Sequence, residues 1–346
     1  MFPVRAICFR VILPCLLTFA SQALAQTSID EVHVAPRQKT AGLTTTDLST
    51  TDLATAAYAD PAARLAAGGL IRANAELVLV PVSITDGMNR PVIGLDQENF
   101  QLFENKKPQE IKHFSSEDAP VSIGIVVDTS GSMSYKLDRA RDAVLQFCEE
   151  ANPQDELFLI TFADTPRLAT DFTTRPEEIE NDLLTSQSKG QTSLLDAIYM
   201  ALQKMRGARY ARKALLIVSD GGDNHSRYSE NDVKSAIKES DVMVYAVGVY
   251  ERWVSTQEEL LGPELLQTVA ELSGGRSFSL TNPNDMPAVT RSIGRQLRHQ
   301  YMLAYQPQTA PHDGKWHKIS VKLLVPKSLR YLMHVAARPG YYAGEE

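Results

Sequence analysis

The segment from Val121 to Met133 constrains the fold of this chain more than any other. Its first seven residues are mostly apolar and rich in β-branched side chains, which is typical of a strand buried on both faces. The segment continues into Asp128, Ser130 and Ser132, three oxygen-bearing side chains at alternate positions, and an amphipathic helical pattern follows. In an open α/β sheet, ligands bind beyond the carboxyl ends of such strands. The sequence therefore predicts an oxygen-lined site at Asp128.

Strand and helix patterns alternate between residues 120 and 300. Strands are expected at 121–127, 156–163, 213–219, 241–249 and, more weakly, 276–280, with an antiparallel edge strand at 167–172. Helices are expected at 136–151, 175–186, 193–206, 229–240, 263–273 and 284–299. Near-continuous apolar strands separated by helices predict a doubly wound α/β fold, with a mostly parallel sheet covered on both faces. We assign this domain to residues 119–300.

Shorter β patterns flank this region on both sides. They lie at 77–84, 90–94, 100–104 and 109–114 before it, and at 300–305, 318–324 and 334–337 after it. Neither block is large enough to close a core alone. We therefore expect residues 71–118 and 301–343 to pair into one small antiparallel β domain, into which the α/β domain is inserted. In particular, we expect 77–84 and 318–324 to share a sheet.

The N-terminus has the pattern of a secretory signal peptide. Arg5 and Arg10 precede an apolar run over residues 11–20, and a small-x-small cleavage motif ends at Ala25. The alternative is an uncleaved membrane anchor, but the run is shorter than the roughly 20 residues that a spanning helix needs. We expect cleavage after Ala25 and an exported protein, either periplasmic or secreted to the cell surface. No later segment is long and apolar enough to span a membrane, and residues 26–70 have the composition of a flexible linker.

The cysteines and the net charge further limit the class of protein to which the chain can belong. Removal of residues 1–25 removes Cys8 and Cys15, so Cys148 has no intrachain disulfide partner. Cys148 falls on the apolar face of the helix predicted at 136–151, which favours a core position. The net charge is −7 and the lysines and arginines form no cluster, which argues against a nucleic-acid partner.

Two further loops supply oxygen ligands beside Asp128. Thr192 lies in a loop that opens a helix, and Asp220 follows an apolar strand as Asp128 does. Because the carboxyl ends of parallel neighbouring strands lie side by side, we expect Asp128, Ser130, Ser132, Thr192 and Asp220 to converge. A set of carboxylates and hydroxyls without His or Cys suits Mg²⁺ best, with Mn²⁺ or Ca²⁺ as alternatives. Two carboxylates leave such an ion incompletely neutralised and open to an acidic group of another molecule.

These five residues resemble the metal-ion-dependent adhesion site of von Willebrand factor type A domains. The segments 91–95, 103–105 and 338–342 also resemble a bacterial subgroup of exported proteins with this domain. The resemblance implies that both serines bind the metal directly, that Thr192 and Asp220 bind directly or through water, and that Asp128 mostly orients water. It implies a non-enzymatic binding module whose metal is completed by an Asp or Glu of a partner protein. It also implies that the last helix, 284–299, slides when the metal loops rearrange.

The residues around these loops each have two possible roles. Tyr135, His225, Tyr228 and Trp253 are candidates for an aromatic rim that contacts the partner; alternatively, the loop at 250–262 is packed down by its own tryptophan. Asp223 and Asn224 either support the metal ligands or shape their turn.

Two other functional classes fit the sequence less well. Asp128, His225 and Ser193 superficially resemble a hydrolase triad, but their chain order and flanking residues depart from the subtilisin pattern, and no Gly-rich phosphate loop occurs. The other alternative is a structural subunit of an envelope assembly that uses the metal site constitutively.

Overall fold

The computed structural model describes residues 77–250, 257–307, 313–326 and 332–343. The chain divides into two units, residues 1–72 and 73–346, and every described residue belongs to the second. The predicted signal peptide and the linker at 26–70 lie outside the described residues. None of the helices in the described ranges is long and apolar enough to cross a lipid bilayer.

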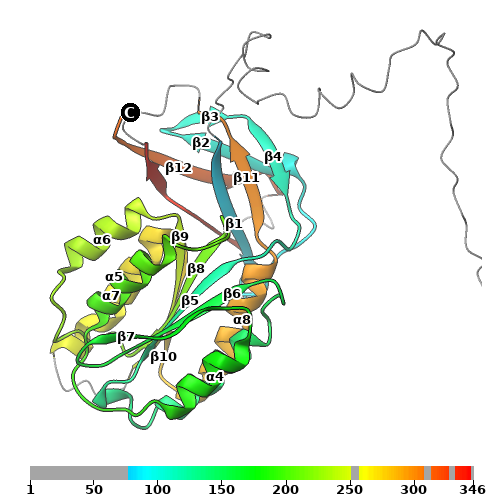
Figure 1. The fold of residues 1–346 in the computed structure, drawn as a ribbon. Helices are drawn as coiled ribbons and strands as arrows, with labels where there is room; N and C mark the ends of the chain where they lie inside the picture. The colour runs from blue at the N-terminus through cyan, green and yellow to red at the C-terminus, as the bar shows by residue number, and fades with distance from the viewer. Residues whose placement is uncertain (1–76, 251–256, 308–312, 327–331, 344–346) are drawn as a thin grey trace, which may run out of the picture. The chain divides into compact units, whose positions relative to one another are not determined.

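A six-stranded sheet forms the centre of the α/β domain (Figure 1). Its strands are, in spatial order, β10 (Arg276–Leu280), β9 (Val242–Val249), β8 (Lys213–Ser219), β5 (Ser122–Asp128), β6 (Glu156–Phe162) and β7 (Pro166–Thr173). All neighbours are parallel except β7, which runs antiparallel to β6 at the edge. The predicted fold class, a mostly parallel α/β sheet accompanied by antiparallel β structure, is therefore confirmed.

Helices cover both faces of this sheet. One face packs against α3 (Leu137–Cys148), α4 (Pro176–Thr185) and α8 (Met286–Arg298), and the other against α5 (Leu194–Met205), α6 (Glu230–Glu239) and α7 (Gln257–Ser273). Cys148 is buried in the first of these layers, as predicted. The helix predicted at 263–273 begins six residues earlier, at Gln257, so Pro263 lies inside α7.

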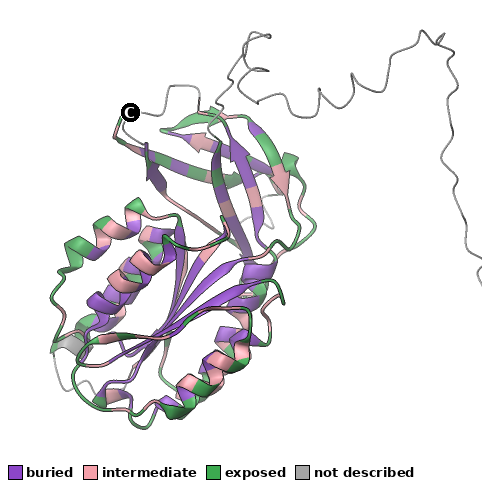
Figure 2. Cartoon of the chain, in the orientation of Figure 1, coloured by how far each residue is buried: buried purple, intermediate pink, exposed green. Residues whose placement is uncertain are grey.

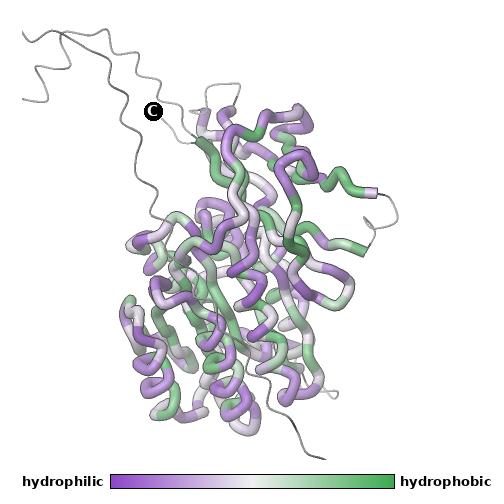
Figure 3. Tube along the Cα trace, turned by 90° about the vertical axis from the view of Figure 1, so that its right-hand side faces the viewer, coloured by the Kyte–Doolittle hydropathy of each residue, from purple (hydrophilic) through white to green (hydrophobic). Residues whose placement is uncertain are grey.

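Strands β5, β6 and β9 are buried along their whole length, and β8 is buried except at Lys213 (Figure 2). Apolar stretches accordingly run through the interior of the domain, while the helices alternate between polar and apolar residues (Figure 3). Packing across the sheet is tight at Gly124, where an added Cβ would lie 2.3 Å from Cζ of Phe158 and 2.4 Å from Cδ2 of Leu215. Glycine therefore lets the side chains of both neighbouring strands meet over β5.

Two four-stranded antiparallel sheets form a sandwich beside the α/β domain. The first sheet contains β13 (Met333–Ala337), β1 (Val78–Asp86), β11 (Tyr301–Tyr305) and β4 (Ile111–Ser115). The second contains β14 (Gly340–Tyr342), β12 (Trp316–Leu323), β2 (Phe100–Glu104) and β3 (Lys107–Gln109). Each sheet combines strands that precede the α/β domain in the sequence with strands that follow it. One apolar core joins the two sheets.

The strand pairing within the sandwich differs from the expected one in two respects. The prediction that 77–84 and 318–324 share a sheet is wrong: β1 lies in the first sheet, paired with β11 and β13, whereas β12 lies in the second, paired with β2 and β14. The single strand predicted at 109–114 is divided between β3 and β4, which belong to different sheets. Alternating patterns identify half-buried strands, but strands of both sheets carry the same alternation, so the pattern does not select the partner.

A buried histidine crosslinks the second sheet. His317 on β12 hydrogen-bonds Glu104 on β2 through Nδ1 and Asp313 through Nε2, the latter at 3.0 Å. Burial lowers the pKa of His317, but the hydrogen bonds and charges of these two carboxylates outweigh that effect and raise it above its usual value.

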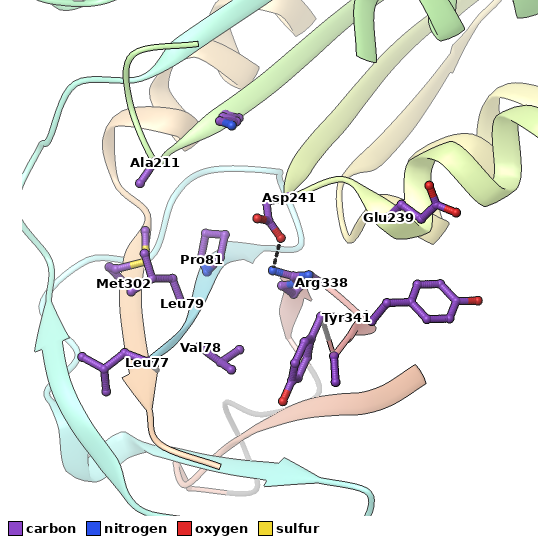
Figure 4. A pocket seen from close by; sticks show the side chains of 13 residues that line it. Leu77, Val78, Leu79, Pro81, Ala211, Glu239, Asp241, Met302, Arg338 and Tyr341 are labelled. Carbon is purple, nitrogen blue, oxygen red and sulfur yellow. Dashed lines mark hydrogen bonds and ion pairs between the residues drawn. The ribbon is translucent and has the colours of Figure 1, made fainter. Parts of the chain in front are cut away.

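Polar contacts join the sandwich to the α/β domain. Gln300, between α8 and β11, donates through Nε2 to Oγ of Ser83 at 3.2 Å and to the hydroxyl of Tyr245 at 3.3 Å. An ion pair of 2.5 Å between Arg338 and Asp241 borders a cavity of about 490 Å³ between the two parts (Figure 4). Since Asp241 immediately precedes β9, this cavity lies at the end of the sheet opposite Asp128.

Candidate metal site

Three loops meet at the carboxyl ends of β5 and β8. The loop that follows β5 is tied by backbone hydrogen bonds to the loop that precedes α5. The Gly131 amide donates to the Gly190 carbonyl at 3.0 Å, and the Lys189 amide donates to the Thr129 carbonyl at 2.9 Å. These bonds fix the first loop against the second independently of any side chain.

The loop after β8 is tied to the same α5 loop around Thr192. The amides of Asn224 and His225 donate to the Thr192 carbonyl at 3.0 and 3.1 Å, and the Thr192 amide donates to Oδ1 of Asn224 at 2.9 Å. The side chain of Asn224 therefore positions the backbone of Thr192. Asp223 contributes differently: its Oδ1 is buried without a hydrogen bond, and burial raises its pKa.

Asp128 is completely buried at the end of β5. Its Oδ1 accepts from the Ser130 amide at 2.8 Å, and its Oδ2 accepts from Oγ of Ser219 at 2.6 Å. Burial and the nearby charge of Asp220 raise the pKa of Asp128 to about 7, against the lowering effect of these hydrogen bonds. Ser219 was not identified from the sequence; its position directly before Asp220 was the available signal.

The two serine hydroxyls lie together. Oγ of Ser130 is 3.1 Å from Oγ of Ser132, because the short 3-10 turn η2 (Gly131–Met133) brings alternate residues to one side. Ser130 is buried and Ser132 is half-buried. The hydroxyl of Ser188 donates to the Ser130 carbonyl, which adds a side-chain link between the first two loops.

Asp220 is paired with a lysine that sequence reasoning missed. Nζ of Lys136 lies 3.1 Å from Oδ2 of Asp220, and both side chains are at most 5% exposed. Lysine is rarely buried unless it is paired. The sequence offers one indication of this role, namely that Lys136 lies close to Ser132. The local pattern indicates only the start of the helix predicted at 136–151.

The candidate rim residues have different surroundings. Tyr135 is 59% exposed, with Nζ of Lys136 lying 5.2 Å from its ring centroid. Tyr228 stacks on Tyr199 of α5 with ring centroids 3.9 Å apart and is 38% exposed. His225 is exposed. Trp253 lies outside the described residues.

A buried carboxylate anchors the loop that carries His225 and Tyr228. Oδ1 of Asp196, in the first turn of α5, accepts from the amides of Arg227 and Tyr228 at 2.8 and 2.9 Å. This anchor was also missed, since an acidic residue in a first helical turn has an ordinary explanation in the helix dipole.

The residues of the site suit a hard divalent cation. No three His, Cys, Asp or Glu side chains gather to hold a metal ion in the part of the chain that the structure describes. A cation at this place therefore depends on the hydroxyls of Ser130, Ser132 and Thr192 beside the carboxylates of Asp128 and Asp220. The ammonium group of Lys136 against Asp220 shows that positive charge is stabilised there. An all-oxygen donor set favours Mg²⁺, Mn²⁺ or Ca²⁺ over Zn²⁺.

The fold and the site together define an α/β domain with a hydroxyl- and carboxylate-lined loop cluster. Residues 123–222 match the family model described as the von Willebrand factor type A domain. All five candidate metal ligands lie within the matched residues.

Similar proteins come from several bacteria. A UPF0353 protein of Mycobacterium tuberculosis is 25% identical over 201 residues, which cover 51% of this chain and 60% of that protein. The chain thus spans about 60% of the length of the curated relatives it matches first. A von Willebrand factor type A structure from Catenulispora acidiphila is 15% identical with a TM-score of 0.48, covering 80% of this chain and 65% of its own. The vWF domain of the type V pili tip protein Mfa5 from Porphyromonas gingivalis is 13% identical with a TM-score of 0.44, covering 52% and 95%.

Proposed function

We propose that this chain is an exported, non-enzymatic protein-binding module. Mg²⁺, held by Ser130, Ser132, Thr192 and water beside Asp128 and Asp220, binds an Asp or Glu side chain of a partner protein. The metal supplies a Lewis-acidic position for that carboxylate. The residues of this chain orient the ion, exclude bulk water and limit its neutralisation to two carboxylates.

The observation that carries this proposal is the pairwise linkage of the three loops. Backbone bonds join the first loop to the second, and Asn224 joins the third to the second. Hydroxyls on separate loops bind an ion well only where their positions are fixed before it arrives. The linkage supplies that preorganisation without using the candidate ligand oxygens.

The contacts of the candidate triad residues support a non-enzymatic role. Oγ of Ser193 donates to the Ala163 carbonyl at 2.8 Å, so it is engaged in holding the loop. His225 contributes a backbone amide to the Thr192 carbonyl, and its side chain is exposed. A nucleophile activated by a neighbouring base, which hydrolysis of this type requires, is not formed by these two residues.

Isothermal titration of the mature chain with Mg²⁺ and Mn²⁺ tests the proposal. Ser132→Ala removes one proposed ligand, and Ser134→Ala is the matched control, because Ser134 is exposed two residues further along the same turn. We expect binding by the natural protein and by the control, and at least about tenfold weaker binding by Ser132→Ala. Absence of binding by the natural protein, or equal affinities for all three proteins, would contradict the proposal.

The partner's carboxylate requires a separate measurement. We expect a protein partner retained on the immobilised chain in Mg²⁺ to be released by EDTA, and its retention to be lost when its contacting Asp or Glu is changed to Asn or Gln. A partner that stays bound in EDTA would show that the contact does not depend on the ion. A stoichiometric complex that is already present on isolation and dispersed by EDTA would favour the assembly-subunit alternative.

A further inference from the structure

Lys136 is an unusual residue to find beside a cation site. Its side chain is 3% exposed, and its ammonium group lies 3.1 Å from Oδ2 of Asp220. Its backbone fixes it in place: the Lys136 amide donates to the Met133 carbonyl at 2.8 Å, and its carbonyl accepts from the Ala140 amide at 2.9 Å. Lys136 therefore joins the serine turn to α3 and directs a positive charge at one of the candidate metal ligands.

The net charge of the site follows from the formal charges of its two carboxylates, its lysine and the cation. With both carboxylates ionised, as metal binding requires, Asp128 and Asp220 carry two negative charges and Lys136 carries one positive charge. A divalent cation then leaves the cluster with one net positive charge. Without Lys136, the formal charge of the same cation would be cancelled by the two aspartates, contrary to the incomplete neutralisation expected from the sequence, and an incoming anion would meet no excess charge.

We propose that Lys136 is a built-in counter-cation that sets the charge of this site. It competes with the divalent cation for Asp220 and so weakens metal binding in the absence of a partner. It also leaves the metal-loaded site with one positive charge, which favours a single carboxylate from the partner. This inference rests on the proposed function, because it concerns the charge of the same metal site.

A purely structural role for this lysine has different consequences. If the ion pair only holds α3 to the β8 loop, removing the charge weakens the fold and leaves the affinity for metal unchanged. If Lys136 competes with the metal, removing its charge leaves two carboxylates without a counter-ion, and the divalent cation becomes their remaining partner. Metal should then bind more tightly and stabilise the variant more than it stabilises the natural protein.

Titration of the mature chain with Mn²⁺ distinguishes these possibilities. Lys136→Met keeps the aliphatic length of the side chain and removes the charge, and Lys136→Arg keeps the charge. Lys189→Met is the matched control, since Lys189 is exposed on the adjacent loop. We expect the dissociation constant of Mn²⁺ to fall about tenfold or more for Lys136→Met, and to stay close to the natural value for Lys136→Arg and for the control. If Lys136→Met is less stable than the natural protein, the rise in melting temperature that Mn²⁺ causes in each protein compares their affinities for the ion.

Each result decides between the two proposals. If the natural protein binds Mn²⁺ and Lys136→Met binds it equally or more weakly, the counter-cation role is overturned and the proposed function stands. If neither protein binds, the metal-dependent function itself fails, and this inference fails with it. Binding by Lys136→Met alone would support the competition and contradict a metal-dependent function in the natural chain.

The carboxylate part of the inference has its own readout. Acetate serves as the probe, compared with chloride at equal ionic strength and corrected for Mn²⁺–acetate binding in buffer. We expect acetate to tighten Mn²⁺ binding by the natural protein more than by Lys136→Met. An equal effect on the two proteins would overturn the link between Lys136 and the acidic ligand.

Discussion

The two buried carboxylates of the site differ in what compensates their charge. Asp220 is paired with the ammonium group of Lys136, whereas Asp128 accepts hydrogen bonds from neutral donors, the Ser130 amide and the Ser219 hydroxyl. Asparagine has nearly the same shape as aspartate, so Asp128→Asn and Asp220→Asn isolate the effect of charge. We expect the two substitutions to change the stability of the metal-free protein in opposite directions.

The magnitude for Asp128 follows from its pKa. Burial and the charge of Asp220 raise this pKa from 3.8 to about 7. At about 1.4 kcal/mol per pH unit, the ionised carboxylate costs the folded protein up to about 4 kcal/mol. Because the folded-state pKa is the higher one, this cost is absent below pH 3.8, grows as the pH rises, and is complete above about pH 7. Asp128→Asn removes the cost but leaves the Ser219 hydroxyl hydrogen without its acceptor, so we expect a net gain of about 1–3 kcal/mol at pH 8.

The opposite result is expected for Asp220. Replacing it by asparagine leaves the ammonium group of Lys136 buried without a counter-ion. Removing one partner of a buried ion pair typically costs about 3–5 kcal/mol.

Urea unfolding followed by circular dichroism, in EDTA at pH 8, measures both effects. Repeating the experiment at pH 5 should shrink the gain of Asp128→Asn, and both variants should lose Mn²⁺ binding at pH 8. The reasoning is refuted if both substitutions shift the free energy of unfolding in the same direction, or if the effect of Asp128→Asn does not depend on pH.

Three further substitutions test other parts of the structure. His317→Gln should lower the free energy of unfolding by about 1 kcal/mol more at pH 6 than at pH 9. A histidine whose pKa is raised in the folded state contributes its stability fully below the unfolded-state pKa, and this contribution is lost as the pH rises through the folded-state pKa. Denaturant unfolding at both pH values measures the difference, and His113→Gln, at an exposed position, is the control. Gly124→Ala should destabilise by about 1–3 kcal/mol through overpacking, whereas Gly87→Ala, with nothing within 4 Å of an added Cβ, should change the denaturation midpoint little. Asn224→Ala should cost about 1 kcal/mol of stability and weaken Mn²⁺ binding in calorimetry, because the Thr192 amide loses Oδ1 of Asn224, the acceptor that positions it.

Local patterns predict the α/β domain because each of its elements carries its own signal. Buried parallel strands are continuous apolar runs, so β5, β8 and β9 agree with the sequence within one residue at each end. Asp128 and Asp220 could be placed together because topology alone determines which ends of parallel neighbours meet. Whether a metal binds there stays a prediction.

The features that could not be predicted from the sequence depend on contacts between segments that are far apart in the chain. Lys136 and Asp220 are 84 positions apart, and nothing near Lys136 distinguishes it from a lysine at an ordinary helix start. The role of Asn224 likewise depends on Thr192, which lies 32 positions away. In the sandwich, β1 and β12 show alternation without any sign of their partners. Such pairings are decided by the packing of the whole core, which no local pattern records.

The last helix bears on how the site is connected to the sandwich. Helix α8 ends at Arg298 and β11 begins at Tyr301, so we expect displacement of this helix to pull on the sandwich. Two of the contacts that oppose such displacement are buried: Oγ of Thr290 donates to the Ala143 carbonyl of α3 at 2.6 Å, and Arg298 pairs with Asp155 at 3.0 Å.

Breaking both contacts at once would cost about 2–4 kcal/mol, since a hydrogen bond between neutral groups contributes about 0.5–1.5 kcal/mol and one between charged groups about 1.5–3 kcal/mol. Coupling free energies between sites are typically about 1–3 kcal/mol. A binding event at the metal loops therefore moves α8 only if new contacts in the displaced position replace those of Thr290 and Arg298. The contacts that Thr290 and Arg298 make within the α/β domain thus contribute to the threshold for the helix sliding that the family resemblance implies.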